Sequence, residues 1–109
     1  MKKQYRIRKN EEFSEIINKK KHFSNACFVL YLNHKKEDKC RIGISVSRKI
    51  GNAVIRNKIK RQIRMMCLKL IDFDNNKYDY IIIVKKAYLN NNYKDNLLYL
   101  EKLIKKDII

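Results

Sequence analysis

The amino-acid sequence predicts an α/β (α+β) two-layer sandwich, in which helices pack on a small mixed β-sheet. Hydrophobic periodicity indicates the order helix, strand, strand, helix, strand, helix along the chain. A length of 109 residues suits one domain, and no linker or internal repeat divides it. No apolar run approaches the roughly 20 residues that span a bilayer. We therefore expect a single globular domain over residues 1–109 that has no membrane partner.

A short helix is predicted over residues 10–20. Asn10 is a candidate N-cap, and Phe13, Ile16 and Ile17 recur at the spacing of one helical face. The basic N-terminus that precedes this helix has no apolar segment behind it and does not resemble a secretory signal. We therefore expect a cytoplasmic protein.

Three later segments have the patterns of β-strands. Residues 26–32 form a short, uninterrupted apolar run, which is typical of a strand buried largely on both faces. Residues 41–47 alternate between branched apolar residues and small or polar ones, which indicates a half-buried strand. Its small, polar face leaves room for something to lie against it. Residues 78–84 form the third strand, which is again strongly apolar.

Two longer helices complete the predicted fold. The first has Asn52 as candidate N-cap and extends to about Leu70. The second covers residues 93–105, and its apolar positions are expected to be buried. These positions are Leu97, Leu100, Leu103 and Ile104.

The helix that begins after Asn52 has two chemically opposite faces. Residues 48–64 contain seven basic residues and no acidic one. At about 100° per residue, the polar residues fall on one arc and the apolar residues on the other. The polar arc holds Arg56, Asn57, Lys58, Lys60, Arg61 and Arg64, and the apolar arc holds Ile55, Ile59, Ile63, Met66 and Leu70. We expect one face to be buried and the other to meet a polyanion.

The distribution of charge supports a phosphate-bearing partner. The net charge is +16, and no acidic residue lies between Asp38 and Asp72. A general enrichment in lysine would explain part of this charge, but five of the seven arginines lie within residues 41–64, and Arg6 and Arg8 form a second group. Clustered arginines without carboxylates repel one another, which a polyanionic partner relieves. A membrane surface is a weaker alternative, because the apolar stripe of the basic helix is narrow and aliphatic.

The sequence contains no set of residues that would catalyse a reaction by itself. Clustered carboxylates, a positioned histidine pair and a glycine-rich phosphate loop are all missing, so we predict no catalytic residue, no metal site and no small-molecule substrate. Cys27, Cys40 and Cys67 are far apart and lie in apolar surroundings, which favours buried structural thiols. A zinc site that combines them with His22 or His34 would have no recognisable ligand spacing.

The segment around the basic helix resembles the bacterial ribonuclease P protein component. Residues 43–54 read GISVSRKIGNAV, and residues 56–64 read RNKIKRQIR. Further similarity lies in NEEF at 10–13, FVLY at 28–31 and YDYIII at 78–83. The resemblance thus covers nearly the whole chain from Lys9 onward.

The resemblance implies a role in tRNA maturation. Proteins of this family bind a large catalytic RNA, which removes the 5′ leader of precursor tRNA with its bound magnesium ions. The expected partners are therefore this catalytic RNA and precursor tRNA, and the protein would be a subunit of an endoribonuclease that holds no stable cofactor of its own. The alternatives are a structural or ribosomal RNA-binding protein without a processing role, and a protein-only endoribonuclease, which the missing carboxylate site disfavours.

The resemblance also implies two binding surfaces. The surface for the RNA subunit would consist of Arg48, Lys49, Asn52, Arg56, Asn57, Lys58, Lys60, Arg61 and Arg64. The 5′ leader would lie in a cleft lined by Phe13, Ile17 and Tyr31, where stacking tolerates any base. Lys58 stands where the family commonly has arginine, and Ile17 stands where relatives often have an aromatic residue. For Phe13 and Ile17, a plain core role is the alternative.

The implied fold contains an unusual connection. It has a sheet of about four strands and a left-handed strand–helix–strand crossover around the basic helix, as in the ribosomal-protein-S5-domain-2-like fold. Parallel strands are joined by right-handed crossovers in about 98% of cases. The sequence patterns alone would favour the right-handed version.

Overall fold

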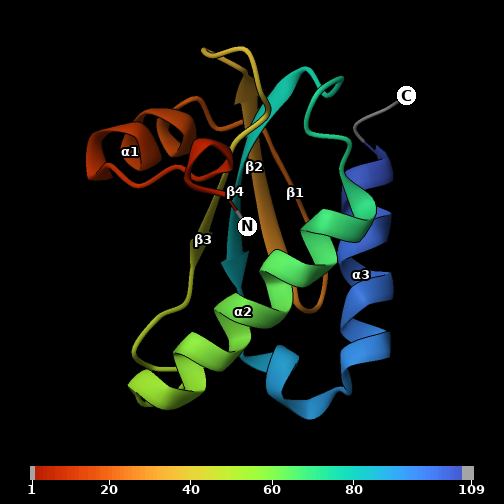
Figure 1. Ribbon diagram of the computed structural model, residues 1–109. Coiled ribbons are helices and arrows are strands. Elements are labelled where there is room, and N and C mark those ends of the chain that lie inside the picture. The colour runs from red at the N-terminus through yellow and green to blue at the C-terminus, as the bar shows by residue number, and fades with distance from the viewer. Residues whose placement is uncertain (1, 107–109) are drawn as a thin grey trace.

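The computed structural model describes residues 2–106, which form helices on both faces of one four-stranded sheet (Figure 1). Along the chain the elements are η1 (Lys3–Tyr5), α1 (Asn10–Asn18), β1 (His22–Ser24), β2 (Phe28–His34), β3 (Ile42–Ser45), α2 (Ala53–Leu70), β4 (Tyr78–Val84), η2 (Lys86–Asn90) and α3 (Tyr93–Lys106), where η marks a 3₁₀ helix. The predicted mixed sheet with packed helices is confirmed.

The sheet has the strand order β1-β2-β4-β3. The β1–β2 and β2–β4 pairs are antiparallel, whereas β3 and β4 are parallel. The N-terminal segment pairs with the first residue of the edge strand β3, because the Ile7 amide donates to the Ile42 carbonyl at 2.9 Å. Beyond Ile42, therefore, β3 forms one open edge of the sheet next to α2.

The connection from β3 through α2 to β4 is left-handed. In Figure 1 both strands run downward, α2 lies in front of the sheet, and β4 lies to the right of β3. A right-handed crossover would place β4 on the other side. The handedness implied by the family resemblance is thus observed, and the general preference for right-handed crossovers gives the wrong answer for this chain.

The main core lies between the sheet and the helices α2 and α3. The even-numbered residues of β2, β3 and β4 face these helices, and most of them are buried, among them Leu30, Leu32 and Ile82. The buried positions of α2 and α3 include Ile59, Ile63, Met66, Leu100, Leu103 and Ile104. The predicted apolar faces of both helices are therefore largely correct, although Leu70 and Leu97 are only half-buried against the core and Ile55 is exposed. Ile55 is 40% exposed because the first turn of α2 extends past the strands (Figure 1).

The opposite face of the sheet is covered only in part. The odd-numbered residues of β2, β3 and β4 face α1, and a second, smaller core joins Ile7, Ile16 and Ile81 there. Because α1 is only nine residues long, it leaves β2 alternately buried and half-buried. The prediction that the first apolar strand is buried on both faces was therefore too strong.

The predicted boundaries hold best where the apolar run is unbroken. The strand at 78–84 is confirmed residue by residue, and the helix capped by Asn52 begins and ends as expected. The predicted strand at 26–32 begins at Phe28 instead, because the Asn25 side chain accepts from the amides of Cys27 and Phe28 and forms a turn. The strand β1 was not predicted, since a segment of three residues is too short to show a hydrophobic periodicity.

Two further predictions about local structure need correction. Asn10 is the first residue of α1 rather than its N-cap; the N-cap is Lys9, whose side chain makes no capping hydrogen bond. The strand predicted at 41–47 is regular only over Ile42–Ser45. Arg41 was expected on its small, polar face but is buried instead.

Arg41 fixes α1 to the sheet. Its Nη2 atom lies 3.0 Å from Oδ2 of Asp79 on β4 and 2.6 Å from Oε2 of Glu12 on α1, and its Nη1 atom lies 3.2 Å from Oε2 of Glu37. Burial alone would lower the pKa of Arg41, but the hydrogen bonds to Glu12 and Asp79 outweigh it and raise that pKa. Three carboxylates thus hold this guanidinium inside the protein.

Candidate nucleic-acid interface

The helix α2 presents its cations to solvent along most of its length. It begins where the Asn52 side chain accepts from the Ile55 amide at 3.0 Å, and the buried isoleucines then orient the polar arc outward. Three residues of the polar arc are exposed, namely Asn57, Lys58 and Arg61. The other three are half-buried, namely Arg56, Lys60 and Arg64. The arc predicted from helical periodicity is therefore divided between a solvent side and a side that faces the groove described below.

The turn before α2 adds two exposed cations. Arg48 and Lys49 follow β3 directly and are exposed, and the amide of Lys49 is held by the Ser47 hydroxyl at 3.1 Å. Asn52 is exposed as well, but its Oδ1 atom already caps α2. Only its side-chain amide hydrogens remain available for an outside acceptor.

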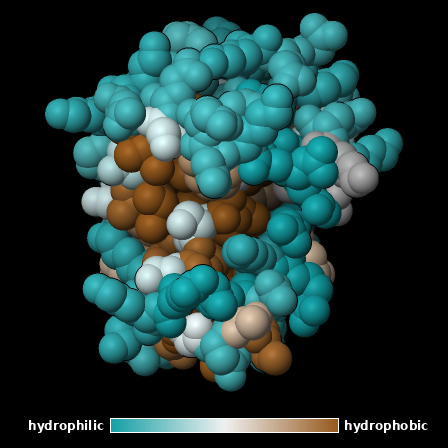
Figure 2. Space-filling model, turned by 90° about the vertical axis from the view of Figure 1, so that its left-hand side faces the viewer, coloured by the Kyte–Doolittle hydropathy of each residue, from teal (hydrophilic) through white to brown (hydrophobic). Residues whose placement is uncertain are grey.

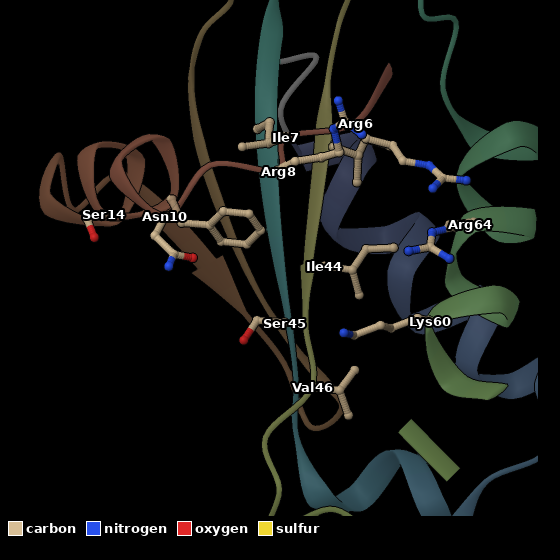
Figure 3. Close-up of a pocket in the computed structure, with 12 residues that line it drawn as sticks. Arg6, Ile7, Arg8, Asn10, Ser14, Ile44, Ser45, Val46, Lys60 and Arg64 are labelled. Atoms are coloured by element: carbon tan, nitrogen blue, oxygen red, sulfur yellow. The ribbon is translucent and has the colours of Figure 1, made fainter. Parts of the chain in front are cut away.

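A groove of about 510 Å³ separates α2 from the N-terminal segment and β3 (Figure 3). Four cations line it, namely Arg6, Arg8, Lys60 and Arg64, together with Phe13 and polar side chains of α1 and with polar and apolar residues of β3. The guanidinium groups of Arg6 and Arg64 point toward each other across it in Figure 3. Burial and then the charge of Arg6 lower the pKa of Arg64, which is the effect expected of two neighbouring cations. An anion in this groove would relieve that repulsion.

The basic side chains of α2 have no acidic partners among residues 2–106. The ion pairs in this part of the chain involve Lys36, Lys39, Arg41 and Lys105. The Nε atom of Arg56 is even buried without a hydrogen-bond partner there. An unneutralised cationic surface of this kind suits a chain of phosphates better than it suits a neutral ligand.

A second surface lies beside α1, on the side of the sheet opposite to α2. Phe13, Ile17, Tyr31 and Ile83 are half-buried there and pack around Ile7, Ile16 and Ile81. Figure 2, which faces the side of the molecule where α1 and β3 lie in Figure 1, shows a continuous apolar area bordered by polar side chains. The structure therefore brings together the three residues predicted for the leader cleft.

The close contact of Phe13 with the sheet depends on Gly43. A Cβ atom at position 43 would lie 2.5 Å from Cζ of Phe13 and 2.7 Å from Cδ1 of Ile81. The ring of Phe13 therefore rests directly on the backbone of β3. This contact gives Phe13 a packing role, but the side chain is only half-buried and part of it remains accessible.

Sequence reasoning did not include Arg6 and Arg8 among the binding residues. They lie about 50 residues from α2 in the sequence, and only the pairing of β3 with the N-terminal segment brings them to the groove. The signal that could have found them is their spacing. Two arginines close together, in a segment without carboxylates, follow the same pattern as the arginines of α2.

The cysteines and histidines lie where the sequence predicted them. Cys27, Cys40 and Cys67 are buried free thiols, and His22 and His34 lie exposed at strand ends. Among the described residues, no three histidine, cysteine or carboxylate side chains come together in a way that could hold a metal ion. None of the helices within residues 2–106 is long and apolar enough to cross a membrane.

Comparison with known proteins identifies close relatives of the chain. A sequence model of the Ribonuclease P family matches residues 1–107. The ribonuclease P protein component of Mycoplasma capricolum is 49% identical over 107 residues, which cover 97% of this chain and 98% of that protein. The corresponding protein of Listeria welshimeri is 44% identical, with 94% of this chain and 90% of the relative covered.

Solved structures agree with these sequence matches. The Staphylococcus aureus RNase P protein superposes with a TM-score of 0.83 at 38% identity, over 94% of each chain. The RNase P protein from Thermotoga maritima superposes with a TM-score of 0.80 at 28% identity, over 93% of this chain and 96% of that one.

Proposed function

This chain belongs to the ribonuclease P protein component family, and from that premise we propose that α2 and its neighbours bind the catalytic RNA, while the surface beside α1 binds the 5′ leader of precursor tRNA. The protein is a subunit of ribonuclease P, so RNA binding and tRNA processing are its functions. Family membership decides against a structural or ribosomal RNA-binding protein without a processing role. Cytoplasmic location is part of the proposal.

The observation that supports the proposal is a pair of unlike surfaces that meet at the β3 edge of the sheet, where Phe13 lines the same groove as Lys60 and Arg64. Exposed cations without carboxylate partners lie on α2 and in the turn before it, which suits the phosphates of a large folded RNA. Half-buried aromatic and aliphatic side chains lie beside α1 on the other face. Such a surface suits unstacked bases, which need flat apolar contacts rather than charge.

In this proposal the protein positions RNA and does not cleave it. Lys58 and Arg61 contact phosphates and reduce the repulsion between the RNA subunit and its substrate. Lys60 and Arg64, together with Arg6, take a phosphate in the groove between α2 and β3. Stacking on Tyr31 and contact with Phe13 and Ile17 hold the leader in a fixed path. Hydrolysis belongs to the RNA and the magnesium ions it binds, so the protein itself requires no resident cofactor.

The first test separates binding from catalysis. Protein free of RNA should leave precursor tRNA intact at any magnesium concentration. Cleavage should begin only when the matching RNA subunit is added. Cleavage by RNA-free protein that disappears in a carboxylate variant would contradict the proposal.

The second test concerns the basic face of α2. Arg61→Gln removes one exposed cation, so it should weaken binding of the RNA subunit and reduce the slope of log K against log salt by about 1. Lys102→Gln is the matched control, because it removes an exposed cation from α3. Equal slopes for Arg61→Gln and the wild type would place the RNA elsewhere.

The third test concerns the leader. Tyr31→Ala should weaken holoenzyme binding of precursor tRNA by roughly 1–3 kcal/mol while leaving mature tRNA almost unaffected. If Tyr31 or Phe13 were only a core residue, truncation would instead destabilise the fold by about 3–5 kcal/mol and impair both ligands. Melting temperatures measured alongside the two affinities distinguish these roles. A stable Tyr31→Ala protein with wild-type preference for precursor would exclude Tyr31 from the leader site.

A further inference from the structure

The aromatic surface beside α1 continues past Tyr31 to the edge of the sheet. The register pairs Gly43 with Ile81, Ile81 with Tyr31, and Tyr31 with His22. These four residues form one row across all four strands, on the face that carries α1. Neighbouring strands are about 4.8 Å apart, so His22 lies one strand spacing beyond Tyr31.

The imidazole of His22 is held in place in this row. Its ring centroid lies 5.0 Å from that of Tyr31, with an angle of 35° between the planes. Its Nδ1 atom donates to the Lys20 carbonyl, at 2.8 Å. Lys20 has a positive φ of 62°, so the turn that ends α1 presents this carbonyl to the ring. The side chain remains exposed, and its Nε2 atom faces no partner among the hydrogen bonds of the described residues.

We propose that His22 forms an additional base-binding position of the leader site, one base beyond Tyr31. The imidazole offers a flat face for stacking, and its Nε2 atom offers one polar contact to a base or a ribose hydroxyl. This inference rests on the proposed leader site. Because α2 and the basic groove lie at the β3 edge and His22 lies at the β1 edge, a leader that crosses the sheet reaches His22 last. His22 therefore contacts a base farther from the tRNA body than the base on Tyr31.

The test uses the reconstituted holoenzyme and a series of precursor tRNAs whose leaders are shortened by one nucleotide at a time. His22→Ala should weaken binding of the longer leaders about fivefold, the lower end of the range for base stacking. The shortest leaders and mature tRNA should bind as they do to the wild type. His22→Phe keeps a flat ring and should retain affinity for the long leaders within about twofold.

The chain provides a matched control in its other histidine. His34 is also exposed and also lies against a tyrosine, with its centroid 5.3 Å from that of Tyr78 at an angle of 31°. As an even-numbered residue of β2, however, it belongs to the opposite face of the sheet. His34→Ala should therefore leave binding of every leader unchanged.

The outcomes separate this inference from the proposed function. If His22→Ala binds all leaders as the wild type does, or weakens mature tRNA equally, the inference is wrong. If Tyr31→Ala loses the preference for precursor in the same series while His22→Ala keeps it, only the inference fails. If neither the wild type nor Tyr31→Ala distinguishes precursor from mature tRNA, the proposed leader site fails, and His22 with it.

Discussion

Replacement of Asp79 by asparagine should strongly lower the stability of the protein, because it removes the buried partner of Arg41. Asp79 is 1% exposed and accepts from both the backbone amide and the Nη2 atom of Arg41, each at 3.0 Å. An asparagine can still accept one of these hydrogen bonds. Its NH₂ group cannot accept the other, so a donor would face the buried guanidinium.

The magnitude follows from what remains around Arg41. Removal of one partner of a buried ion pair costs about 3–5 kcal/mol, because the other charge stays buried. Glu12 still lies 2.6 Å from Nη2 and is only 24% exposed, so it retains part of the compensation. We therefore expect Asp79→Asn to lower the free energy of unfolding by about 3 kcal/mol, the lower end of this range. For a domain of this size, that loss lowers the melting temperature by roughly 12 °C.

The assay is urea and thermal unfolding of the purified protein at neutral pH, in enough salt to screen its net charge of +16. Glu37→Gln is the control, because Glu37 also pairs with Arg41 but is 61% exposed, at 3.2 Å. Loss of an exposed pair changes the free energy of unfolding by about 0.2–1 kcal/mol. The two variants remove the same charge, so the difference between them reports burial.

Two results would refute this reasoning. If Asp79→Asn lowered the free energy of unfolding by less than about 1 kcal/mol, Glu12 and Glu37 would be sufficient to hold the buried guanidinium, and Asp79 would not be its main partner. If Glu37→Gln cost as much as Asp79→Asn, burial would not be what makes the Asp79 contact strong.

Three other substitutions or reactions test separate parts of the structure. Gly43→Ala should lower the free energy of unfolding in urea by about 1–3 kcal/mol and weaken precursor binding, because the new methyl group displaces the Phe13 ring. An unchanged free energy of unfolding would contradict the close contact between Gly43 and Phe13. Asn52→Ala should lower the free energy of unfolding, measured in urea, by about 1 kcal/mol, because α2 loses its N-cap. Burial raises the pKa of the Cys27 and Cys67 thiols, so a disulfide reagent at pH 8 should label them only after unfolding; rapid labelling of the native protein would disprove their burial.

Much of the fold follows from local sequence patterns. The strand β4 and the helix α2 were predicted almost residue by residue, because an unbroken apolar run and a capped 3.6-residue period are strong signals. The strand β1 could not be predicted, since its three residues depend on pairing with β2. The handedness of the crossover is likewise a property of the whole chain, and here only the family resemblance indicated it.

The candidate site was predictable to a similar degree. Helical periodicity placed the cations of α2 on one arc, and the structure keeps them there. Periodicity alone did not show that Lys60 and Arg64 would meet Arg6 and Arg8 in a groove, because those arginines come from a distant segment. The leader residues depended on the resemblance, since Phe13, Ile17 and Tyr31 come from two elements that no local pattern connects.

Arg41 shows why charge counting along the sequence has a limit. It lies in the same acid-free interval as the arginines of α2, and it was counted with them as evidence for a polyanionic partner. The fold brings Glu12, Glu37 and Asp79 to it, and these residues lie outside that interval. Arg61 and Arg64 form no ion pair with any carboxylate among the described residues. Arg41 therefore holds α1 in place, whereas the arginines of α2 form no ion pair among the described residues.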